Sequence, residues 1–126
     1  MTLQAAFEEQ AGHCIALGSP FMGQLMSVLA RDWPADTALG RKFAALKGDI
    51  GPSGASLPLR IAGGLHALVL KRKAPALMAV YPPHKASDQA LSEAVRDAIT
   101  THEAFLLDWT DSAPQTNEVR RSAALI

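Results

Sequence analysis

"LPLRIAGGLHALVL", residues 57–70, is the stretch that decides the fold. Apolar side chains fill almost all of it, and Ser56 stands directly before it as a helix N-cap. The second half, "LHALVL", has the composition of a strand. It nevertheless lies within a longer helical pattern and has no turn signals on both sides. We therefore predict a strongly apolar helix here.

Two features inside this helix need a reason. Gly63 and Gly64 together cost about 1–2 kcal/mol of helix propensity relative to alanine. Such a cost suggests that something approaches closely, and a neighbouring helix is favoured over a ligand. His66 follows in an otherwise apolar setting, so we expect a core histidine that is hydrogen-bonded to a backbone carbonyl. We expect it to be buried near Gly63, against the first helix or the long helix of residues 87–109, with no metal, and we keep it as a contact candidate.

Apolar residues recur at helical spacing on both sides of this stretch, and no other segment reads as a strand. The expected boundaries are a stop at Gly18, starts at Ser19-Pro20, Pro75 and Ser87, a cap at Asp36, a loop over 48–56, and a last helix from Thr116. The helix from Ser87 is predicted to be the longest, with one apolar stripe reaching Trp109. The sequence therefore predicts an all-α fold, an orthogonal or bundle-like packing of about six or seven helices in a single domain, 1–126.

Composition limits the class of protein. The chain has 126 residues, of which 48% are hydrophobic, enough for a packed core. Twelve basic residues balance twelve acidic ones, so no overall field favours nucleic acid or an anionic membrane. A single cysteine, the absence of a signal-peptide pattern and the absence of a bilayer-length apolar run favour a soluble cytoplasmic domain.

The candidate chemistry is sparse before the C-terminal segment. The histidines lie far apart and none pairs with another at helical ligand spacing, so we expect no metal site and no cofactor. Lys71, Arg72 and Lys73 are explained by the negative end of the helix dipole. His102 and Glu103 are adjacent and point apart, with only His102 expected on the buried stripe. We find no complete active site.

The last segment, "SAPQTNEVRRSAALI" (112–126), carries the densest run of hydrogen-bonding side chains. A helix cap explains Thr116 or Asn117, and the dipole explains Glu118. Neither explains Gln115, Arg120 or Arg121, and each arginine can bind a carboxylate or phosphate with a bidentate fork. Gln115, Arg120 and Arg121 are therefore contact candidates. We keep Asn117 and Glu118 as candidates beside them, because they belong to the same polar run.

Three stretches carry a family resemblance: "LPLRIAGGLHALVL" (57–70), "LMAVYPP" (77–83) and "SAPQTNEVRRSAAL" (112–125). In this order and spacing they resemble the N-terminal part of a bacterial family of uncharacterised proteins, domain of unknown function 2332. The resemblance spans essentially the whole chain. It implies a helical region that, in longer members, leads into a methyltransferase-like Rossmann region with a glycine-rich loop, which is absent here.

Two functions follow as expectations. The chain is either an accessory N-terminal domain of a methyltransferase-like protein, not catalytic alone, or a non-catalytic interaction module that self-associates. In the first case the partner is a downstream Rossmann-like domain, contacted through the polar run. In the second case a symmetric dimer covers an apolar stripe formed by Val119, Ala123 and Ile126 with Leu125 alongside. The end of the long helix, with Phe105, Leu106 and Trp109, is expected at the same contact.

Overall fold

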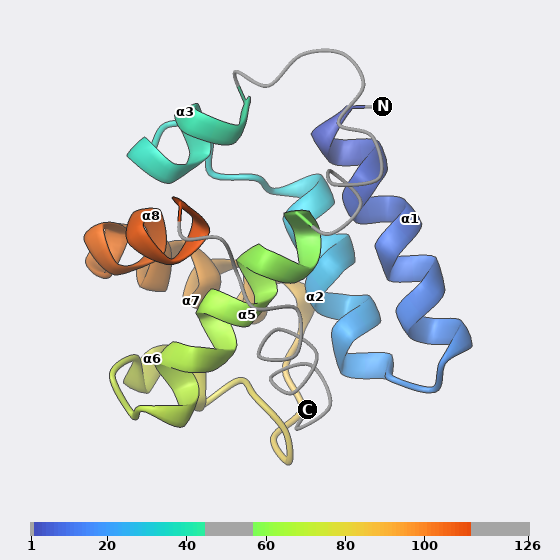
Figure 1. Cartoon of the computed structure of the whole chain (residues 1–126). Coiled ribbons are helices and arrows are strands. Elements are labelled where there is room, and N and C mark those ends of the chain that lie inside the picture. Colours follow the sequence, from blue (N-terminus) through green and yellow to red (C-terminus); the bar gives the residue numbers. More distant parts are fainter. Residues whose placement is uncertain (1, 45–56, 112–126) are drawn as a thin grey trace.

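The apolar stretch of residues 57–70 forms helix α5 (Leu57–Leu70), which runs through the middle of the molecule (Figure 1). The computed structural model describes residues 2–44 and 57–111. Within these ranges the chain is entirely helical, without strands, which confirms the predicted all-α class and the number of helices. The other helices are α1 (Leu3–Ala16), α2 (Pro20–Arg31), α3 (Ala38–Ala44), α6 (Pro75–Met78), α7 (Asp88–Thr101) and α8 (Glu103–Asp111).

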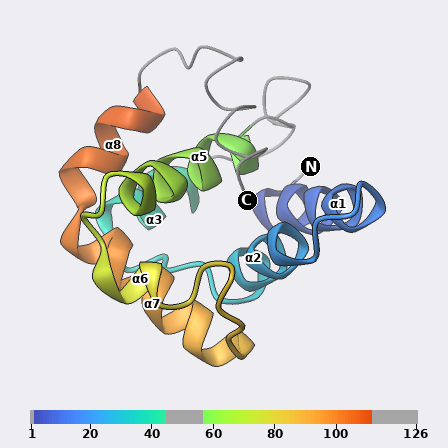
Figure 2. The same cartoon turned by 90° about the horizontal axis from the view of Figure 1, so that it is seen from below.

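The helices surround α5. Figures 1 and 2 both place α1 and α2 on one side of α5, and α6, α7 and α8 on the other. Helices α1 and α2 make the most extensive pairing, and α5 contacts α1, α2, α6 and α8. The largest fully buried side chains include Phe7, Leu25, Met26, Leu29, Leu65, Leu68, Tyr81, Leu91 and Ile99. Among the described residues, every helix is too short or too polar to cross a bilayer.

Helix α1 ends at the predicted glycine. Gly18 has a positive φ of 86°, a backbone conformation that favours glycine. Its N–H donates to the Ile15 carbonyl (3.0 Å), and the N–H of Ser19 donates to the Cys14 carbonyl (2.9 Å). This pair of bonds is a Schellman motif, which satisfies carbonyls that the helix leaves without partners.

Helix α5 ends in the same motif with a different residue. The N–H of Arg72 donates to the Val69 carbonyl (3.0 Å), and the N–H of Lys73 donates to the Leu68 carbonyl (2.9 Å). Arg72 therefore takes the glycine position, with a φ of 56°. A residue with a side chain adopts this conformation at a cost of about 1–2 kcal/mol. The three cations 71–73 thus follow the helix end instead of lying in its last turn.

The predicted cap of α3 is wrong by one residue. The hydroxyl of Thr37, not the Asp36 carboxylate, accepts the N–H of Gly40 (2.9 Å), which is the geometry of an N-cap. Asp36 instead forms an ion pair with Arg96 of α7. Either residue type caps helices well, so the local sequence does not distinguish them.

The single long helix predicted from Ser87 is in fact two helices. Ser87 does begin α7, because its Oγ accepts the Ala90 N–H (3.1 Å). The chain then leaves helical geometry at His102, with φ −112° and ψ 35°, and α8 starts anew. The break lets α8 lie on α5 while α7 packs against α2 and α6. The apolar stripe crosses this break at unchanged spacing, so the pattern alone does not reveal it.

The glycine pair of α5 receives α8. A Cβ on Gly64 would stand 2.8 Å from Leu106 Cδ2 and 3.2 Å from Trp109 Cδ1, and one on Gly63 would stand 3.5 Å from the same indole. The Trp109 Nε1–H also donates to the Arg60 carbonyl (3.0 Å). The prediction of a close helix at these glycines is confirmed, and α8 is that helix.

Candidate functional site

Most of the predicted contact residues lie outside the described part of the chain. Gln115, Asn117, Glu118, Arg120 and Arg121 all belong to the stretch after residue 111, as does the helix expected from Thr116. Their role as a contact surface therefore stays a prediction. His66 is the one candidate whose surroundings the structure describes.

His66 is completely buried, with no exposed surface. Its Nδ1 lies 2.7 Å from the hydroxyl oxygen of Tyr81, and its Nε2 lies 3.2 Å from Sδ of Met22 in α2. The His66 and Tyr81 rings meet edge to face with centroids 5.5 Å apart, and the Phe21 ring packs against the tyrosine ring with centroids 4.6 Å apart. Three segments of the chain thus close around one polar pair.

The neighbours of His66 fix its protonation. A thioether sulfur only accepts hydrogen bonds, so the imidazole nitrogen that faces Met22 must carry the proton. The other nitrogen then accepts the O–H of Tyr81, and both polar groups are satisfied. Burial lowers the pKa of His66 to about 4 and raises the pKa of the Tyr81 hydroxyl above its usual range. The pair is neutral over the physiological pH range.

The structure confirms the expected burial of His66 and corrects its partners. We expected a backbone carbonyl, but the histidine is bonded to two side chains. We also expected it to pack on the first or the long helix, whereas its contacts are Met22 of α2 and Tyr81 beyond α6. The carbonyls of α5 are occupied within the helix, so the imidazole finds partners across the core.

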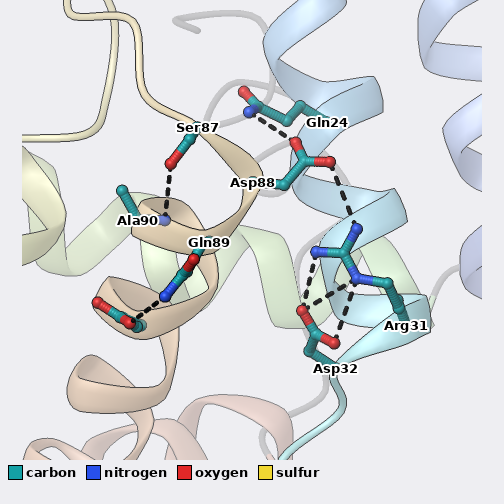
Figure 3. Close-up of polar contacts among 8 residues, drawn as sticks. Gln24, Arg31, Asp32, Ser87, Asp88, Gln89 and Ala90 are labelled. Atoms are coloured by element: carbon teal, nitrogen blue, oxygen red, sulfur yellow. Dashed lines mark hydrogen bonds and ion pairs between the residues drawn. The ribbon is translucent and has the colours of Figure 1, made fainter.

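A second polar cluster lies on the surface, where α2 meets the start of α7 (Figure 3). The Arg31 guanidinium donates to Asp32 with Nη2 at 2.9 Å and to Asp88 with Nη1 at 3.4 Å. The Gln24 amide donates to the same Asp88 carboxylate (3.0 Å) and to the carbonyl of Ala86 (2.9 Å). These contacts join the two helices through one shared carboxylate.

The electrostatics of this cluster follow from its contacts. Hydrogen bonds from Gln24 and Arg31 lower the pKa of Asp88, and hydrogen bonds from Arg31 and Ser92 lower the pKa of Asp32. Asp88 also lies in the first turn of α7, where the helix dipole favours a negative charge. Both carboxylates are thus ionised, and both are paired with the same cation, the Arg31 guanidinium. This cluster was not predicted from the sequence, which indicated only that a helix starts at Ser87.

The adjacent pair His102 and Glu103 needs a correction. Glu103 was expected to face solvent, but it is half-buried, and its Oε1 accepts the backbone N–H of Ala38 at 2.6 Å. The carboxylate therefore holds the start of α3 against α8. His102, expected on a buried stripe, is half-buried at the break between α7 and α8. Among the described contacts, the two side chains do not form an acid–base pair, and the Glu103 carboxylate has a structural role instead.

A metal site requires several ligating side chains close together. Over residues 2–44 and 57–111, no three histidine, cysteine or carboxylate side chains gather as a metal would need. Cys14 is buried in α1. The described helices thus offer a sealed histidine–tyrosine pair and a self-paired surface cluster.

A family model with the description "uncharacterized protein conserved in bacteria" (DUF2332) matches residues 4–126. The chain belongs to this family. The match covers nearly the whole chain and confirms the resemblance found in the sequence. Neither a curated protein nor a solved structure matches this DUF2332 chain.

Proposed function

We propose that this DUF2332 chain is a helical accessory domain of a methyltransferase-like protein and has no catalytic activity of its own. The observation that carries the proposal is the sealed state of the His66–Tyr81 pair. Burial shifts the pKa values of His66 and Tyr81, because their exposed fractions are only 0% and 2%. A catalytic acid or base must come within hydrogen-bond reach of its substrate. Neither side chain can do so.

The surface cluster supports the same proposal. The Arg31 guanidinium forms ion pairs with Asp32 and Asp88. The Gln24 amide donates a further hydrogen bond to the Asp88 carboxylate. The cluster holds the start of α7 on α2 and leaves no arginine fork directed at a ligand. We assign the contact with a Rossmann-like domain to the polar run at 115–121, whose hydrogen-bonding side chains are the densest in the sequence.

The test is calorimetric titration of the chain with the Rossmann region of a longer family member, and separately with S-adenosylmethionine. We expect binding to the Rossmann region and none to S-adenosylmethionine alone. Replacing Arg120 and Arg121 by alanine should weaken the protein contact at least about tenfold, because each loses charge-assisted hydrogen bonds. Arg41→Ala, at an exposed position of α3, is the control. Failure of the Rossmann region to bind, or tight binding of S-adenosylmethionine to this chain, would contradict the proposal.

The second candidate, self-association, is favoured by apolar exposure at the turn after α1. Ile15 is 62% exposed and Leu17 is 85% exposed. Exposed apolar side chains in a group mark contact surfaces. Leu106, which we expected at a dimer contact, is buried against α5 and is not available for it.

Sedimentation equilibrium at micromolar concentration tests this candidate. A dimer that dissociates in Ile15→Ser/Leu17→Ser places the contact at the α1 turn. A dimer that dissociates only in Val119→Ser/Ile126→Ser places it at the C-terminal stripe. A monomer at all concentrations would exclude self-association in this range.

A further inference from the structure

The turn that follows α5 presents three cations and one apolar side chain to solvent. Leu70 is 54% exposed, and Lys71, Arg72 and Lys73 are exposed beside it. We call residues 70–73 the α5 tip. It lies at the edge of the molecule next to α6, on the opposite side from α1 (Figure 1).

Arg72 stands where the backbone prefers glycine. The end of α1 has the same two hydrogen bonds and uses Gly18 at the equivalent position. The helix dipole favours cations anywhere near this end, so it does not account for an arginine at this one strained residue. Within the described residues, the Arg72 side chain makes no ion pair, hydrogen bond or ring contact. Among the described residues, no contact of this side chain offsets the backbone strain.

The neighbours of Arg72 shape the surface. The Lys71 ammonium lies over the Phe105 ring, 5.2 Å from its centroid, so its side chain is held in place. Lys73 is exposed and, like Arg72, has no acidic partner among the described residues. The tip therefore combines two cations that have no acidic partner in the described part of the chain, one positioned cation and an exposed leucine.

We propose that the α5 tip binds an acidic segment of another protein that carries an apolar side chain. An arginine fork matches a carboxylate with two parallel hydrogen bonds, and Leu70 supplies the apolar contact. A nucleic acid fits less well, because the chain has equal numbers of acidic and basic residues and the cations are confined to one short turn. Binding at the tip does not depend on the accessory role proposed above, since residues 115–121 are not involved.

The experiment uses the full chain and a blocked peptide, Glu-Glu-Leu-Glu-Glu, in low-salt calorimetry. We expect binding that weakens as salt is added. Arg72→Gly should weaken it about tenfold, because a charged hydrogen-bonding group is lost. The same variant should melt at or above the wild-type temperature, because glycine relieves the backbone. A role limited to the fold would not separate these two readouts.

Matched probes complete the test. Arg41→Gln makes a comparable change of charge on α3 and should bind the peptide like the wild type. A peptide with alanine in place of leucine should bind more weakly than the original. Absence of peptide binding, equal weakening by Arg41→Gln, or unchanged binding in Arg72→Gly would overturn the proposal. Tighter association with phosphatidylserine vesicles or a single-stranded oligonucleotide than with the peptide would overturn the choice of a protein partner.

Discussion

Helix α2 makes two polar contacts of opposite kinds. On one side, Met22 reaches into the core and meets the buried His66–Tyr81 pair. On the other side, Gln24 and Arg31 reach across the surface to Asp88 at the start of α7. The first contact is neutral and sealed, and the second is charged and open to water.

The two contacts differ in how much the stability of the fold depends on them. A buried polar group without a partner loses its full hydration, whereas an exposed ion pair exchanges its partner for water at little cost. The core pair should therefore decide stability, and the surface cluster should only adjust it.

The largest effect is expected for His66→Ala. The change leaves a cavity and removes the acceptor of the Tyr81 hydroxyl, so we expect a loss of about 3–5 kcal/mol in the free energy of unfolding. His84→Ala, at an exposed position, is the control and should stay within about 0.5 kcal/mol. Urea unfolding of both variants measures the difference. Equal stability of the two would contradict a sealed pair.

On acidification, the two regions should lose their contributions to stability in different pH ranges. The folded pKa of His66 is about 4, below its ordinary value of 6.5, so the unfolded chain takes up this proton first. The contribution of neutral His66 to the free energy of unfolding should be fully present above pH 6.5. The free energy of unfolding should then fall by about 3 kcal/mol as the pH drops to 4. The lowered pKa values of Asp32 and Asp88 place their contribution lower, because it is lost only as the pH falls below their ordinary value of 3.8.

Urea unfolding at intervals between pH 7 and pH 4.5 measures this slope. The variant His66→Gln, which cannot titrate, should lose most of it. A slope of wild-type size in His66→Gln would assign the acid sensitivity to other groups.

A change of packing tests whether the core side is sensitive without any polar group. A methyl group on Gly64 must displace Leu106 or the Trp109 indole, so Gly64→Ala should cost about 1–3 kcal/mol. Gly12→Ala in α1 is the control, because its new Cβ would meet no atom within 4 Å. That variant should gain about 1 kcal/mol from helix propensity. Thermal unfolding should thus move in opposite directions, and a gain in both would disprove close contact at Gly64.

The smallest effect belongs to the surface cluster. Asp88→Asn removes the shared charge but keeps a hydrogen-bonding side chain, so we expect the melting temperature to change by a few degrees at most. The change should vanish in high salt, which screens exposed charges. A loss as large as that of His66→Ala would reverse the comparison between the two sides of α2.

Local signals in the sequence predicted much of this architecture. Gly18, Pro20 and Ser87 mark helix ends through backbone chemistry that acts within a few residues, and the structure has those ends. The pair Gly63–Gly64 predicted a close helix for the same reason. The break at His102 was not predictable in this way, because the apolar spacing continues across it.

The partners of His66 were beyond local reasoning. A lone histidine in an apolar helix implies burial, but Met22 and Tyr81 lie 44 and 15 residues away in the chain. Only the packing of α2, α5 and the segment after α6 brings them together. The cluster around Asp88 is similar, since exposed Arg, Asp and Gln side chains are ordinary at any surface and carry no sign of a partner.

The protonation state of His66, observed through its ring nitrogens by NMR, tests most directly whether the His66–Tyr81 pair is neutral and closed to water. A sealed, neutral pair predicts a proton on Nε2, an unprotonated Nδ1, and no titration of this ring above about pH 5. A His66 midpoint close to 6.5, together with rapid exchange of its ring proton, would show that water reaches the pair and would contradict the closed core.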